Sequence, residues 1–361
     1  MVKKLPLAEK TNIKNWAFED LVLKDISEST LCNTGIHPME NQIILVDGTI
    51  IHNTAPLGVK VEVENLGELM PIPNQLIYSN GTKRNSCLVI TVPKNTPITE
   101  TLSVVVVAKE RSLVHKTHVI LEESSALEMV ENYIGIGNFN ANIMSTFELE
   151  ANASLTVNTV NNMAAGTVVY HHKHVQMKND SFIDTTNFII NDTNLVFEDF
   201  THLIGRGAEA DVKTVAIASG KQQQNITVRT ENIADHTVGN IVNYGIVKDD
   251  AHLAFNGVGK IYKASKESDN QQETRLLNLS KTAEAIANPF LLIDEGDITA
   301  GHAASIGQLD EEQIYYLMSR GMSRAQASKM IVSGFLTPFV DAIDDEEMRA
   351  TLERKIESKL G

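Results

Sequence analysis

The chain has 361 residues, with 31 Lys and Arg against 46 Asp and Glu, so its formal net charge is -15 at neutral pH. This length suits one large elongated domain with a smaller appendage better than one ordinary compact core. The acidic balance argues against a nucleic-acid binder, which needs clustered Lys and Arg to neutralise phosphates. The two cysteines, Cys32 and Cys87, can neither build a disulfide framework nor supply the four thiolates that an iron–sulfur cluster usually takes.

Residues 1–45 are predicted to form a short N-terminal segment of helix and loop, either a docking arm or a small cap. The first nine residues contain two lysines but no apolar run long enough for a secretion signal. The longest uninterrupted apolar run of the chain, Val104–Ala108, has about a quarter of the length that a membrane-spanning helix needs. We therefore expect a cytoplasmic protein in a reducing compartment, with no membrane partner.

Residues 46–300 are predicted to be mainly β, because short alternating apolar runs are separated there by Asn, Asp, Gly and Ser. The clearest candidate strands are residues 59–64, 88–92, 118–122, 147–150 and 155–160.

A drifting repeat of 27 or 28 residues runs through this β region. The apolar residues Leu127, Leu155, Phe182 and Ala210 follow one another at that spacing, and similar polar turn units precede several of the strands. Such a repeat indicates a solenoid, in which each coil buries its inward residues against its neighbours, and a parallel β-helix fits best. A β-sandwich is the competing architecture, and an antiparallel barrel also remains open.

Residues 301–361 are predicted to form a C-terminal helical domain, with Pro289–Ile293 as the last strand before it. Asp310 is a good N-cap for a helix from Glu311 to Arg320, and Ser323 repeats the capping pattern for a second helix. A third helix is predicted at residues 345–359, because it begins acidic and ends basic, as the helix dipole favours.

Candidate chemical motifs in the chain are weak. Gly257–Lys260 lacks both the upstream glycine and the Ser/Thr of a phosphate-binding loop. On a strand, His172 and His174 would share one face and His171 the other, so we expect an exposed or stacked polar ladder there and no confident metal site. Asp249–Asp250 would point to opposite faces of a strand, so the pair cannot flank one glycosidic bond, and a turn is its better use.

The most specific motif is DITAGHAASIG at residues 297–307, preceded by NPFLLI at 288–293 and followed by QIYYLMSRG at 313–321. With these motifs the sequence resembles the SufB/SufD family of the SUF iron–sulfur cluster assembly system, and within it the SufD members. Family-like residues also occur in order upstream, so the resemblance covers about residues 230–345. It implies a right-handed parallel β-helix core with a C-terminal α-helical domain, which the strand and cap patterns indicate independently.

The resemblance further implies a scaffold subunit that is not an enzyme, within a SufB–SufC–SufD complex in which SufC hydrolyses ATP. SufB would pair with this chain through the β-helix, and SufC would bind its C-terminal helices. Aromatic, Met and Arg side chains are favoured interface anchors. For the SufC contact we therefore expect residues of the helical region, some of which must instead be core: Tyr315, Tyr316, Arg320, Met330, Phe335 and Phe339.

His302 matches a family histidine near the SufB–SufD interface, where the resemblance implies that clusters assemble. Many family members have a cysteine two residues earlier, where this chain has Ala300, so we do not expect this subunit to bring a thiolate. No stably bound cofactor is expected on this chain alone, although a cluster could be held transiently in the complex.

Two other readings stay open at this stage. A carbohydrate-active β-helix enzyme is the alternative function, and the lack of a secretion signal counts against it. The third is a free-standing binding solenoid. An open β-helix end that normally meets a similar subunit can also meet a copy of itself, so a homodimer of the isolated chain is compatible with the scaffold reading.

Overall fold

The computed structural model describes residues 36–63, 86–109, 112–136, 140–164, 168–343 and 346–360. Most of the predicted N-terminal segment, including Cys32, lies outside these residues, and so does the start predicted for the third helix.

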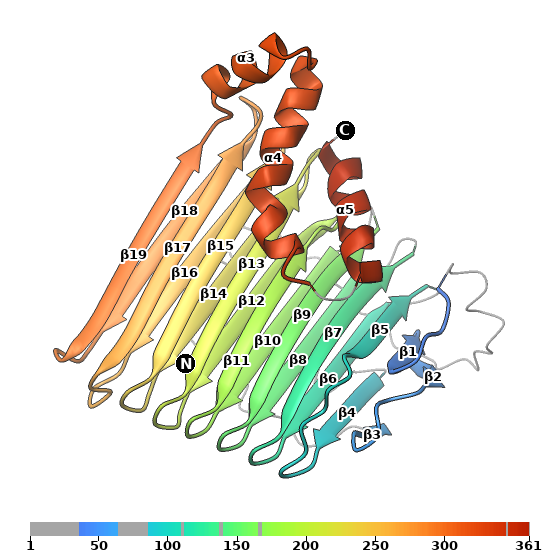
Figure 1. The fold of residues 1–361 in the computed structure, drawn as a ribbon, viewed down its shortest axis with the longest axis vertical. Coiled ribbons are helices and arrows are strands. Elements are labelled where there is room, and N and C mark those ends of the chain that lie inside the picture. The colour runs from blue at the N-terminus through green and yellow to red at the C-terminus, as the bar shows by residue number, and fades with distance from the viewer. Residues whose placement is uncertain are drawn as a thin grey trace.

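The strands form two sheets that face each other (Figure 1). Sheet A contains β1 (Gln42–Val46), β2 (Thr49–Asn53), β5 (Leu102–Ala108), β7 (Ala126–Gly135), β9 (Ser154–Met163), β11 (Phe182–Ile189), β13 (Glu209–Ala218), β15 (Val238–Val247), β17 (Ser268–Asn278) and β19 (Ile298–Gly307). Sheet B contains β3 (Lys60–Val63), β4 (Ser86–Val92), β6 (Leu113–Leu121), β8 (Asn140–Leu149), β10 (Val168–Met177), β12 (Asn194–Leu203), β14 (Gln223–Asn232), β16 (His252–Ile261) and β18 (Glu284–Ile293).

From β4 onward the chain alternates between the two sheets, and each strand pairs in parallel with the strand two places further along. In the described part of the chain, only the pairs β1–β2 and β3–β4 are antiparallel. This arrangement is a parallel β-helix, as predicted, and not a sandwich of antiparallel sheets. The predicted strands are all present, most of them longer than expected.

The turns between strands repeat the same backbone conformation in successive coils. Ser124, Asn152, Asp180 and Asp249 all have positive φ, between 55° and 59°. Asn and Asp tolerate this left-handed region better than most residues, which explains why polar turn units recur before the strands. Each turn also bonds to the next coil, as in Ser124 N to the carbonyl of Ala151 at 2.9 Å. The use of Asp249 in a turn agrees with the sequence prediction.

The inward side chains of both sheets form one continuous core between the sheets. Leu127, Leu155 and Ala210 lie in it, as the repeat predicted, but Phe182 does not. Its neighbour Ile183 pairs with Leu155 and with Ala210 and is fully buried. Because side chains alternate along a strand, an error of one residue moves the prediction to the outer face.

Three helices follow the solenoid: α3 (Glu311–Ser319), α4 (Arg324–Val340) and α5 (Glu346–Leu360). Asp310 caps α3 by accepting from the amide of Glu312 at 2.8 Å, and Ser323 caps α4 in a complete capping box with Gln326. The starts of α3 and α4 were therefore predicted correctly.

The strand prediction was wrong at its C-terminal limit. A further strand, β19, follows Pro289–Ile293 and pairs with β17 along its whole length, from Ile298 to Gly307. Its Ala, Gly and Ser residues have little intrinsic strand preference, so pairing with the preceding coil decides the conformation. The predicted boundary at residue 300 falls inside this strand.

The helices have no separate core in the described structure, because α4 and α5 pack on the outer face of sheet A (Figure 1). Phe188 and Val215 of the sheet share one apolar cluster with Leu336 and Leu352 of the helices. Polar contacts hold the end of α5: Asp192 accepts from Lys355 at 2.6 Å and lies 3.0 Å from the Lys359 ammonium.

Candidate functional site

The C-terminal end of the solenoid is open. β18 and β19 are the last strands of their sheets, and every residue in both is at least partly exposed. Phe290 and Leu292 on β18 and Ile306 on β19 are large apolar side chains, with Ile306 50% exposed. An unpaired strand edge with exposed apolar residues is a typical surface for pairing with another chain.

His302 lies in this open end, within β19 and not in a loop before a helix. It pairs in register with Gln272 of β17, which follows Ile241 of β15 along the inner face of sheet A. His302 therefore belongs to the face of β19 that continues the interior of the solenoid, which we call the lumen, and it is exposed. The imidazole can act there as a hydrogen-bonding or ligating group.

Just inside the open end, two side-chain amides lie across the lumen. Gln272 donates from Nε2 to the carbonyl of Phe290 at 2.9 Å, and Asn270 donates to Thr230 at 2.9 Å. Gly259 on β16 makes room for them, because a Cβ there would lie 2.1 Å from Asn270 Oδ1. These contacts lie one coil behind His302.

The second predicted site, the SufC contact, divides into exposed and packed residues. Tyr315 is 75% exposed, Tyr316 and Met330 are also exposed, and the Arg320 guanidinium lies 5.1 Å from the Tyr316 ring centre. These four residues are available to a partner.

The two phenylalanines are packing residues. The rings of Phe335 and Phe339 lie 4.7 and 4.6 Å from the Tyr244 ring on β15, so they hold α4 on sheet A. This assignment fits the expectation that part of the predicted set is core.

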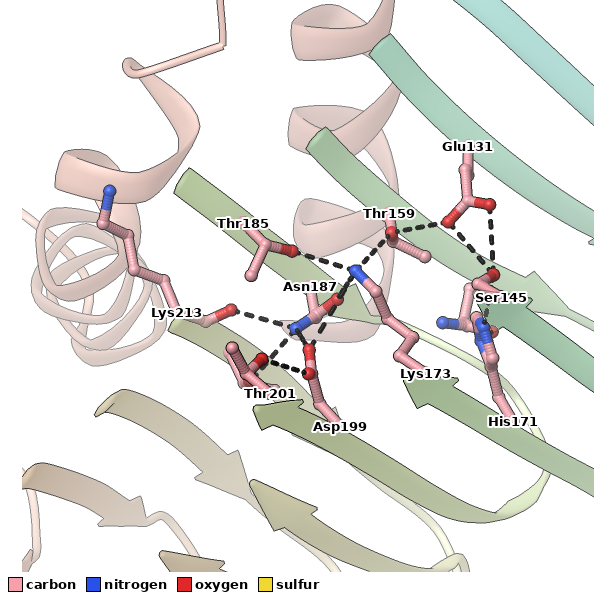
Figure 2. Close-up of polar contacts among 12 residues, drawn as sticks. Glu131, Ser145, Thr159, His171, Lys173, Thr185, Asn187, Asp199, Thr201 and Lys213 are labelled. Carbon is pink, nitrogen blue, oxygen red and sulfur yellow. Dashed lines mark hydrogen bonds and ion pairs between the residues drawn. The ribbon is translucent and has the colours of Figure 1, made fainter. Parts of the chain in front are cut away.

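A third constellation, which the sequence prediction missed, lies in the middle of the lumen (Figure 2). We call it the lumen network, and it joins inward side chains of β7 to β12: Glu131, Tyr133, Ser145, Thr159, Asn161, His171, Lys173, Thr185, Asn187, Asp199 and Thr201. All of these side chains are buried.

Lys173 is the cation of the lumen network. Its ammonium donates to Thr159 at 3.1 Å and to Thr185 and Asn187 at 2.9 Å, which uses all three of its hydrogens. The Asp199 carboxylate lies 4.0 Å away. Burial lowers the pKa of Lys173, whereas the charges of Asp199 and Glu131 oppose that shift.

Glu131 is the second carboxyl of the lumen network. Tyr133 and Ser145 each lie 3.0 Å from its Oε1 atom, and Thr159 lies 3.1 Å from Oε2. Burial raises the pKa of Glu131, with Lys173 acting in the opposite direction. The network also continues through Tyr133 and Thr117 to His115, over distances of 3.3 and 2.9 Å.

The three histidines of β10 lie on both faces of sheet B. His171 is inside, and burial together with the Lys173 charge lowers its pKa well below the usual range. His172 and His174 stack on the outer face with ring centres 6.3 Å apart, which agrees with the predicted ladder, but His172 is buried and hydrogen-bonded to Glu198 at 3.2 Å. No group of three potential metal ligands occurs in the described part of the chain.

A signal for the lumen network does exist in the sequence. Glu131, Thr159 and Asn187 pair in register at successive coils, spaced by one repeat, and Thr214 and Asn243 continue the row. A polar residue recurring at an inward position of the repeat predicts such a row. Recognising the row requires the correct register of the repeat, and the prediction that placed Phe182 on the inner face was wrong by one residue.

No helix in the described residues is long and apolar enough to cross a membrane. The cytoplasmic location stays a prediction.

Residues 104–335 match the family model described as SUF system FeS cluster assembly, SufBD core domain. The chain is 37% identical over 275 residues to the iron–sulfur cluster assembly protein SufD of Bacillus subtilis, which covers 74% of this chain and 63% of that protein. The match thus spans a little less than two thirds of that relative. A SufBD family protein of Mycobacterium tuberculosis is 26% identical over 286 residues, covering 76% of this chain and 72% of that protein.

Proposed function

The chain belongs to the SufB/SufD family of SUF iron–sulfur cluster assembly proteins, and we propose that it acts there as a SufD-like scaffold subunit without ATPase activity of its own. In the proposed complex, SufB pairs with the solenoid and SufC binds the C-terminal helices. SufC hydrolyses ATP, and its motion reaches the cluster site through α4 and sheet A.

The open end of the solenoid is the observation that carries this proposal. Its exposed apolar residues and the unpaired outer edges of β18 and β19 suit a partner with the same fold, because such a partner continues both sheets across the junction. His302 lies at that junction, and Cys87 is buried in β4 in one of the first coils. The one cysteine within the described residues is thus remote from the junction, and in this proposal the thiolates come from the partner, with His302 assisting as a ligand or proton acceptor. A cluster is cargo in this scheme.

The proposed SufC surface consists of Tyr315, Tyr316, Arg320 and Met330. Tyr315 and Tyr316 are exposed on α3, Arg320 at its C-cap and Met330 on α4, whereas Phe335 and Phe339 attach α4 to sheet A. Force applied to the exposed residues is thereby transmitted to the strands beneath. Replacing Tyr315 and Met330 by Ala should weaken SufC binding without loss of helix content in circular dichroism.

Co-expression with SufB and SufC, followed by size-exclusion chromatography, tests the proposal. The wild-type chain should elute in a ternary complex, and Ile306→Asp should weaken SufB binding at least about tenfold, the equivalent of about 1.4 kcal/mol. Leu57→Asp is the matched control, because Leu57 is fully exposed in a turn outside the C-terminal coils. Absence of a ternary complex, or equal effects of the two variants, would contradict the proposal.

The role of His302 has its own test. A His302→Ala variant should still assemble with SufB and SufC, but should mature iron–sulfur enzymes more slowly. Normal maturation by this variant would remove the site assignment and leave the scaffold role intact. Homodimers of the isolated chain would agree with the proposal if added SufB displaces them.

A further inference from the structure

We propose that the lumen network is a proton-binding site, in which one proton resides on Glu131 and fixes, through Ser145, the position of the ring hydrogen of His171. The site is separate from the open end and from the helical face. It does not depend on the function proposed for either.

The charges in the lumen network call for such a proton. Lys173 is its one ammonium, whereas Glu131 and Asp199 are two carboxyl groups, and all three side chains are buried. Three other titratable groups face Glu131: Tyr133 from the same strand β7, His115 from β6 and His171 from β10. None of these adds positive charge, because burial keeps both histidines neutral. An unmatched charge in a dry interior is costly, and one bound proton removes it.

The choice of Glu131 over Asp199 follows from their neighbours. Asp199 lies 4.0 Å from the Lys173 ammonium and accepts from the Asn187 amide at 3.0 Å, so a positive charge and an amide donor both face its carboxyl group. Among the described residues Glu131 forms no ion pair within that distance, and its partners are the hydroxyls of Tyr133, Ser145 and Thr159. A hydroxyl can accept a hydrogen bond from a carboxylic acid as readily as it donates one to a carboxylate.

Counting hydrogens links that proton to His171. In the amide orientation shown, Asn161 Oδ1 lies 3.0 Å from Nδ1 of His171, and because a carboxamide oxygen only accepts, the proposed state has the ring hydrogen on Nδ1. Nε2 of a neutral imidazole is then an acceptor, and its neighbour is Ser145 Oγ at 3.2 Å. Ser145 has a single hydrogen, which goes to His171. Ser145 and Glu131, 3.0 Å apart, would then be two acceptors in contact unless Glu131 donates.

The same atoms also accommodate the ionised form of Glu131. When the site gives one proton to solvent, the hydrogen on Nδ1 of His171 leaves, the Ser145 hydrogen moves to Nε2, and the Glu131 proton moves to Ser145, so that Glu131 is left ionised. Ser145 then donates to the carboxylate and accepts from Nε2. Nδ1 then becomes an acceptor, and a rotated Asn161 amide donates to it. The Nδ2 atom of Asn161 has no partner within the described structure before that rotation. One proton leaves the site, and the imidazole keeps one hydrogen throughout.

Nitrogen NMR of the full chain labelled with ¹⁵N-histidine tests the relay. The His171 signals, assigned by their loss in His171→Asn, should report a hydrogen on Nδ1 at neutral pH and on Nε2 once Glu131 ionises at higher pH. In Ser145→Ala the position of the His171 ring hydrogen should no longer change when Glu131 ionises. A hydrogen on Nε2 at neutral pH, or a doubly protonated ring, would overturn the proposal.

Infrared spectroscopy reads the proton itself, because a protonated carboxyl has a carbonyl band distinct from that of a carboxylate. The wild-type chain should show this band at neutral pH, Glu131→Gln should lose it, and Glu150→Gln on the surface should retain it. Should Glu131→Gln fail to fold, isotope labelling of glutamate in the wild-type chain still assigns the band. A wild-type spectrum without a protonated glutamate band refutes the assignment.

Discussion

Replacement of Lys173 by Met tests whether the lumen holds a charged lysine, because Met keeps most of the apolar stem and removes the ammonium. Three acceptors then lose their donor, and Asp199 loses the opposite charge 4.0 Å away. Removing one partner of a buried ion pair costs about 3–5 kcal/mol. We expect Lys173→Met to lower the free energy of unfolding by about 4 kcal/mol. With a urea dependence of about 3 kcal/mol per M, the unfolding midpoint should fall by about 1.3 M.

Lys213→Met is the matched control for this substitution. Lys213 forms an ion pair with Asp184 at 2.7 Å, but both side chains are about one third exposed on the outer face of sheet A. Exposed pairs contribute about 0.2–1 kcal/mol, so its midpoint should fall by no more than about 0.3 M. Equal midpoints for the two variants would refute the reasoning. Combining Lys173→Met with Asp199→Asn should recover part of the loss, because no ionised carboxylate then remains unpaired.

Three further predictions concern packing and pH. Phe339→Ala should destabilise the docking of α4 by about 3 kcal/mol, seen as faster amide exchange in α4, whereas exposed Tyr315→Ala should change stability by less than about 0.5 kcal/mol. Gly259→Ala places a Cβ 2.1 Å from Asn270 Oδ1 and should lower the melting temperature, unlike Gly307→Ala, which meets no atom within 4 Å. Burial lowers the pKa of His115 to about 3, so below the unfolded value of 6.5 the unfolded chain binds protons that the folded chain does not. Stability should therefore decrease as the pH decreases below about 6.5, by up to about 1.4 kcal/mol per pH unit for this residue. Between neutrality and about pH 5.5, the urea midpoint of His115→Asn should depend less on pH than that of the wild-type chain.

The fold was predictable because its local signals agree with one another. Polar residues that tolerate positive φ recur at the turns, and apolar residues alternate along the strands between them. Caps such as Asp310 and Ser323 mark helix starts from sequence alone. β19 was missed because Ala and Gly have no strand signal of their own, and only pairing with β17 defines it.

The candidate site was less predictable for two physical reasons. Lysine is almost never fully buried, so the position of Lys173 between two histidines gave no reason to place it inside. Its partners also come from different coils, with Glu131 and Asp199 on either side of it in sequence. Their proximity depends on register, which a period of 27 or 28 residues leaves uncertain by one residue.

The two ends of the solenoid differ, and this difference limits how copies can assemble. The first coils end in β2 and β3, short strands that run antiparallel to their neighbours, whereas the last coil ends in the ten-residue strands β18 and β19. If the edge of β18 or β19 were placed against the short antiparallel strand β2 or β3 of another copy, most backbone hydrogen-bonding groups of the longer strand would stay unpaired. Subunits of this fold can thus meet tail to tail, but head-to-tail growth is disfavoured. We therefore expect association through the open end to stop at two subunits, giving a closed pair in place of a fibre.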